Sequence, residues 1–145
     1  MPTFSNPVED AAEARESVRA LAHASRAFAD PADTYQVVGE LLGTLRSLQQ
    51  VLEQLGATHV RHQESAFLDN GDRSGGLMEA DAAARTLRRA SALVGQAERA
   101  VDEASQHSGR IAWHLAPTLD GPGTDPFARD PFDPHPVALR RGLSL

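Results

Sequence analysis

Apolar side chains recur at alternating steps of three and four residues through the middle of the chain. This spacing is a heptad repeat, and it places one apolar stripe along a helix that packs on other helices. It predicts a long helix over about 33–66 and, with alanine and leucine supplying most of the apolar surface, an all-α fold. We also expect the stripe to form the seam of a homodimer. Its residues are Val38, Leu41, Leu45, Leu48, Leu52 and Leu55.

Two further heptad stripes predict two further helices. The first helix is expected over about 7–29, since Asn6 can cap it, Pro7 suits its first turn, and a second proline follows at residue 31. The other is expected over about 77–108, after the glycine-rich breakers at 69–76. Its stripe consists of Ala80, Ala83, Leu87, Ala90, Val94, Ala97, Val101 and Ala104.

Short connections between these segments make neighbouring helices antiparallel. We therefore predict a three-helix antiparallel bundle over 1–115, in which the long second and third helices form a hairpin and the first helix covers part of it. Gly39 and Gly43, four residues apart in the second helix, are interpreted as a point of close approach between helices.

The composition changes to proline, glycine and aspartate from Ala116 onward, which predicts an extended tail over 116–145. An extended segment can dock apolar and arginine side chains into a groove of another protein. The alternative is a solvated terminus without a binding role. The tail residues expected to bind a partner are Phe127, Phe132, Leu139, Arg140, Arg141, Leu143 and Leu145.

Composition excludes several kinds of chemistry. The chain has no cysteine, and all 14 of its basic residues are arginine. Thiol catalysis, disulfides, cysteine-ligated zinc, Schiff bases and the lysine of a phosphate-binding loop are therefore excluded. Neither a Gly-x-Ser-x-Gly elbow nor a glycine-rich phosphate loop is present. We expect a protein that is not an enzyme and has no cofactor.

Two histidines invite a metal-binding interpretation. His59 and His62 lie three residues apart on the long helix, so both imidazoles could face one ion. The Glu-x-x-His element of di-iron helical bundles is absent, however, and the other candidate ligands are on distant segments. We therefore predict no metal site, with both histidines continuing the heptad stripe.

The charge balance constrains the partners. Twenty acidic residues against 14 basic ones give a formal charge of −6, which repels phosphate backbones and anionic membranes. We therefore do not expect general nucleic-acid binding. The alternative function is an accessory nucleic-acid-binding factor that uses a local patch of Arg85, Arg88 and Arg89, joined by Arg140 and Arg141 of the tail. No segment reaches the roughly 20 apolar residues of a membrane span, so a cytoplasmic location without membrane contact is expected.

Residues 30–46, from Asp30-Pro31-Ala32-Asp33 to Thr44-Leu45-Arg46, resemble uncharacterised helical proteins from high-GC actinobacteria, and so does Gly109-Arg110-Ile111-Ala112-Trp113-His114. The resemblance covers roughly half of the chain. It implies an accessory role in the biology of mobile elements, and it supplies no catalytic residue. The residues themselves predict a non-enzymatic interaction or adaptor protein that engages another protein through its apolar stripe or its tail.

Overall fold

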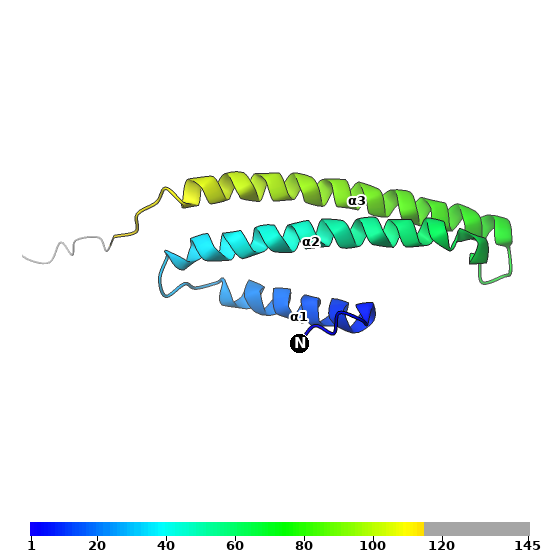
Figure 1. Cartoon of the computed structure of the whole chain (residues 1–145), viewed down its shortest axis with the longest axis horizontal. Helices are drawn as coiled ribbons and strands as arrows, with labels where there is room; N and C mark the ends of the chain where they lie inside the picture. Colours follow the sequence, from blue (N-terminus) through cyan, green and yellow to red (C-terminus); the bar gives the residue numbers. More distant parts are fainter. Residues whose placement is uncertain (115–145) are drawn as a thin grey trace, which may run out of the picture. The chain divides into compact units, whose positions relative to one another are not determined.

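The computed structural model describes residues 1–114 of the chain. Three α-helices account for most of this segment: α1 (Pro7–Ala24), α2 (Asp33–Arg61) and α3 (Arg73–Ser108) (Figure 1). A short 3-10 helix, η1 (Gln63–Ser65), lies between α2 and α3, and residues 1–114 contain no strand. The predicted all-α fold with three helices is confirmed. The predicted tail over 116–145 lies outside the described residues.

The helices α2 and α3 form the predicted antiparallel hairpin and pack side by side (Figure 1). Three cross-helix contacts fix their register, namely Arg46 with Glu98, the Gln49 side chain over Gly95, and Glu53 with Ser91. In each of these pairs the two residue numbers add up to 144. Residues of α2 and α3 whose numbers have this sum therefore lie level with each other along the hairpin.

Small residues line the centre of the contact between α2 and α3. Ala84 is fully buried and Ser91 is 2% exposed, and Gly56 and Gly95 are buried beside them. A Cβ atom added to Gly56 would lie 3.3 Å from the carbonyl oxygen of Ala84, so the two backbones approach closely here. Leu42, which is 8% exposed, is the one large apolar side chain among residues 1–114 that is buried.

Two glycines that were expected to mark a close approach between helices lie in open space. A Cβ atom added to Gly39 or to Gly43 would meet nothing within 4 Å. Our interpretation of this glycine pair is therefore wrong. Both residues are exposed, because the seam with α3 runs along a neighbouring side of α2.

The connection between α2 and α3 lies earlier in the chain than predicted. The first helix of the hairpin ends at Arg61 rather than near 66, and α3 begins at Arg73 rather than near 77. Gly71 has a φ of 84° in the turn, a conformation that favours glycine. Gly76, which we expected to break the helix, lies inside α3 and is buried against the backbone of Ala66 and Phe67. Only a residue without a side chain allows this contact.

The helix α1 begins as predicted and ends early. The Asn6 side chain accepts hydrogen bonds from the backbone N–H groups of Val8 and Glu9, at 3.2 and 3.4 Å, and Pro7 occupies the first helical position. The helix ends at Ala24 instead of 29, because residues 25–32 form the connection in which the chain reverses toward α2. No residue of α1 is buried, and no Cα atom of α1 comes within 8 Å of a Cα atom of α2 or α3.

Candidate functional site

The apolar stripe of α2 divides between two sides of the helix. The seam with α3 shares Val38, Leu45 and Leu52 with the predicted stripe, but at every second position it uses the next residue along the chain. These seam residues are Leu42, Gln49 and Gly56, of which Leu42 and Gly56 are buried. Leu41, Leu48 and Leu55 therefore lie beside the seam, and Leu48 and Leu55 are 43% and 45% exposed.

The stripe of α3 divides in the same way. Its seam positions recur at steps of three and four through Ala80, Ala84, Leu87, Ser91, Val94, Glu98, Val101 and Ser105, all of them buried or half-buried. The other predicted positions each precede a seam residue by one, and they therefore lie beside the seam. They are Ala83, Ala90, Ala97 and Ala104, which are half-buried or exposed.

The two displaced stripes lie on one side of the hairpin. In both helices the displaced residues precede a seam residue by one position, which rotates them by about 100° around the helix axis. Because the two helices are antiparallel, this rotation directs the displaced residues of both helices to the same side of the hairpin. The residues three or four positions before or after them on each helix complete this surface, which we call the uncharged face. It consists of Val37, Leu41, Thr44, Leu48, Val51, Leu55 and Thr58 on α2, with Ala83, Thr86, Ala90, Leu93, Ala97, Ala100 and Ala104 on α3.

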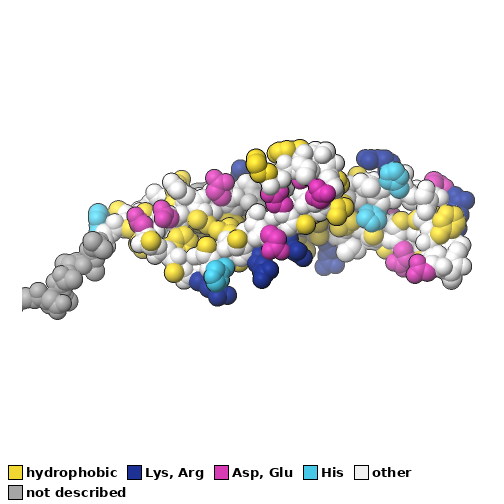
Figure 2. Space-filling view, turned by 90° about the horizontal axis from the view of Figure 1, so that it is seen from below, with side chains coloured by type: hydrophobic (Ala, Val, Ile, Leu, Met, Phe, Trp, Pro, Cys, Tyr) yellow, Lys and Arg dark blue, Asp and Glu magenta, His cyan; other side chains and the backbone are white. Residues whose placement is uncertain are grey.

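None of the 14 residues of the uncharged face carries a charge, although 23% of the chain is charged. The register places leucines of α2 within one residue of being level with alanines of α3, since the numbers of Leu48 and Ala97, and of Leu55 and Ala90, add up to 145. Large residues on one helix and small ones on the other leave room for a third helix above the seam. Hydrophobic side chains are visible between the charged groups on the molecular surface (Figure 2). A continuous exposed apolar surface of this kind is typical of an interaction site.

The opposite side of the hairpin is polar. Both Nε and Nη2 of Arg46 lie 2.8 Å from Oε1 of Glu98, and the Ser91 hydroxyl donates a hydrogen bond of 3.0 Å to Oε1 of Glu53. Arg88 lines a shallow hollow beside these groups. An exposed ion pair contributes at most about 1 kcal/mol to stability. These contacts therefore fix the register more than they stabilise the hairpin, and they leave the uncharged face on the other side free of polar partners.

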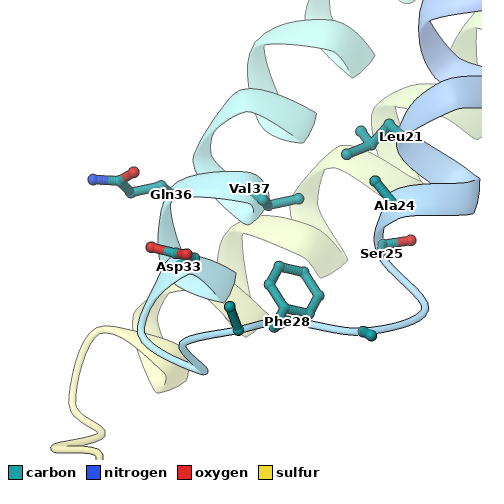
Figure 3. Close-up of a pocket in the computed structure, with 9 residues that line it drawn as sticks. Leu21, Ala24, Ser25, Phe28, Asp33, Gln36 and Val37 are labelled. Carbon is teal, nitrogen blue, oxygen red and sulfur yellow. The ribbon is translucent and has the colours of Figure 1, made fainter.

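An open hollow of about 430 Å³ separates the end of α1 from the start of α2. Leu21 of α1, Phe28 of the connection and Val37 of α2 point toward one another across it, whereas Gln36 points away (Figure 3). Val37 is also the first residue of the uncharged face. The apolar lining of the hollow is thus continuous with that face.

The two histidines singled out by the sequence adjoin the end of the uncharged face, and the three arginines lie outside it. His59 Nδ1 is 2.8 Å from the carbonyl oxygen of Leu55, and His62 caps the end of α2. In the described segment, no three histidine, aspartate or glutamate residues are grouped so that they could hold a metal ion. All three arginines are exposed, with Arg85 paired to Asp81 within α3 and Arg88 near Glu53. A nucleic-acid surface at these arginines stays a prediction.

The predicted partner-binding residues of the tail, Phe127, Phe132, Leu139, Arg140, Arg141, Leu143 and Leu145, lie outside the described residues. Comparisons with protein-family models, with curated proteins and with solved structures find no match to this chain. None of the three helices is apolar over a stretch long enough to cross a bilayer. The uncharged face is therefore the candidate site that the described residues offer.

Proposed function

We propose that this protein is a non-enzymatic interaction module, an adaptor that binds an amphipathic helix of a partner protein on the uncharged face of its hairpin. The observation that carries this proposal is the absence of charge at 14 exposed or half-buried positions that share one side of α2 and α3. Helix-in-groove recognition uses such a surface, with anchors at steps of three and four residues.

The shape of the uncharged face favours a helix over an extended peptide. The leucines of the face on α2 are about two helical turns apart and lie nearly level with alanines of α3, and this pattern matches the ridges of another helix. An extended peptide would instead need unpaired backbone groups along an edge, and helices offer none along their length. Burial of apolar surface contributes about 25 cal/mol per Å², so several leucines together can hold a partner helix.

The predicted homodimer is a separate proposal. A second copy would use Leu41, Leu48 and Leu55 of the same face in a twofold pairing. Light scattering of the full chain at micromolar concentration distinguishes this pairing from a complex with another protein, because a monomeric mass excludes a stable homodimer.

Replacing Leu48 by glutamate is expected to abolish partner binding at the uncharged face. A carboxylate in the centre of an apolar contact must be desolvated without a compensating charge, and every 1.4 kcal/mol of that cost reduces binding tenfold. The measurement is recovery of the same identified partner by immobilised wild-type and Leu48→Glu protein. We expect the variant to recover less than about one tenth as much partner as the wild type.

The matched control is Gln50→Glu, which adds the same charge to an exposed position on another side of α2. It should recover the partner as well as the wild type does. Circular dichroism should show equal helix content in both variants, so that lost binding is not lost folding. Undiminished recovery by Leu48→Glu would place the partner's binding site elsewhere in the chain.

A further inference from the structure

The chain itself contains a helix that fits the uncharged face. We propose that α1 closes on the uncharged face of its own hairpin and thereby competes with the partner helix. The competition rests on the proposed function, whereas the closure of α1 does not. Three features of α1 favour closure: its length, its apolar pattern, and its junction with α2.

The length of α1 suits the uncharged face. The helix α1 has 18 residues, which at about 1.5 Å per residue gives it a length of about 27 Å. On α2, the uncharged face advances 21 residues from Val37 to Thr58, or about 32 Å. If α1 runs antiparallel to α2 with Leu21 level with Val37, the first residue of α1, Pro7, lies level with Val51. A closed α1 therefore covers the face from Val37 to Val51 and leaves Leu55 and Thr58 uncovered.

The apolar pattern of α1 matches a groove between two helices. Ala11, Ala14, Val18 and Leu21 follow one another at steps of three and four residues. None of them is buried, and Val18 is 50% exposed. A single helix of this length without a packed face is only marginally stable in water. The helix α1 is therefore stabilised when another surface covers this stripe.

The junction already directs α1 to the uncharged face. Leu21 and Phe28 meet Val37, the first residue of the face, across the open hollow (Figure 3). The connection over residues 25–32 is short, so it holds α1 near α2 at an effective concentration in the millimolar range. A second copy at micromolar concentration competes poorly with a tethered segment. This difference identifies the chain's own α1 as the occupant.

Engineered cysteines test the closure directly, since the chain has no cysteine of its own. If α1 runs antiparallel to α2 with Leu21 level with Val37, then Ala14 lies level with Thr44. A disulfide needs Cα atoms about 4.4–6.8 Å apart, so the Ala14→Cys/Thr44→Cys pair can form one only when α1 is closed. We expect this pair to oxidise within one chain, roughly ten times faster than a control pair.

The control pair is Ala14→Cys/Gly43→Cys. Gly43 has nearly the same height as Thr44 but lies on the polar side of α2, where an added Cβ meets nothing within 4 Å. Equal oxidation rates for the two pairs would overturn the closure. A product with the mass of two chains would also overturn it, because it would assign the face to a second copy. Both readouts come from non-reducing gels and mass spectrometry of the full chain, and neither requires a partner.

Charge substitutions in α1 then separate closure from function. Adding Val18→Glu to the first cysteine pair should reduce its oxidation rate to that of the control, whereas Ala20→Glu, on the opposite face of α1, should not. In the chain without engineered cysteines, Val18→Glu should raise recovery of the partner and Ala20→Glu should leave it unchanged. If α1 cross-links but Leu48→Glu retains the partner, closure stands and the proposed function fails. If the partner is lost but α1 does not cross-link, the proposed function stands and closure fails.

Discussion

Replacing Leu42 by alanine is expected to lower the free energy of unfolding by about 3 kcal/mol. Leu42 is the only large apolar side chain among residues 1–114 that is buried, at 8% exposure, and it lies in the seam between α2 and α3. Alanine would leave a cavity there, because the surrounding structure relaxes only in part when a buried side chain is shortened. Urea unfolding of the full chain, followed by circular dichroism, measures the change.

Leu48→Ala is the matched control for this substitution. Leu48 lies less than two turns from Leu42 along the same helix, but beside the seam, and it is 43% exposed. Its loss should therefore cost about 1 kcal/mol or less. If Leu48→Ala were the more destabilising substitution, the seam between α2 and α3 would run along Leu41, Leu48 and Leu55 instead.

Replacing Gly76 by alanine is expected to lower the free energy of unfolding by about 2 kcal/mol, although alanine favours a helix by about 1 kcal/mol over glycine. The added Cβ would lie 2.5 Å from the Cα atom of Phe67 and closer still to the backbone of Ala66. Backbone atoms of the connection cannot move aside as a flexible side chain can. The start of α3 would therefore have to separate from residues 66–67.

Gly39→Ala and Gly43→Ala are the controls for Gly76→Ala. Both positions are within α2, and an added Cβ meets nothing within 4 Å at either one. Each should therefore raise the free energy of unfolding by up to about 1 kcal/mol through helix propensity alone. The measurement is again urea unfolding. A stabilising effect of Gly76→Ala would show that α3 does not pack on residues 66–67 in solution.

Heptad spacing and capping residues were sufficient to predict the three helices. Asn6 with Pro7 marks the start of α1, and the alternating three- and four-residue steps mark α2 and α3. The ends of the hairpin connection were harder to predict. The glycines at 75 and 76 are typical of a turn, yet they lie in α3, because Gly76 fits against the backbone of Phe67. A pattern of neighbouring residues in the sequence does not reveal such a contact between Gly76 and residue 67.

The register of the seam could not be predicted from hydrophobicity. Leu48 and Leu55 are more apolar than Gln49 and Gly56, and yet the latter two face α3. Close packing decides the register here, since Ala84, Ser91 and Gly95 of α3 allow the backbones to approach and the Gln49 side chain lies over Gly95.

The candidate site was predicted only in part. Its leucines on α2 belong to the predicted homodimer seam, whereas the contribution of α3 was not recognised as part of a surface. The signal for it was present in the sequence: Ala83, Ala90, Ala97 and Ala104 recur every seven residues, and the positions beside them, Thr86, Leu93 and Ala100, are uncharged. Only the antiparallel register shows that these residues and the α2 leucines share one side.

The small side chains between α2 and α3 have a consequence for the protein in its cellular setting. A hairpin whose centre consists of alanine, serine and glycine gains little from burial, so any helix that settles on its flank supplies a large share of the folding free energy. Folding and occupancy are then thermodynamically linked. Chains whose uncharged face is covered neither by α1 nor by another helix would unfold more often and reach proteases sooner.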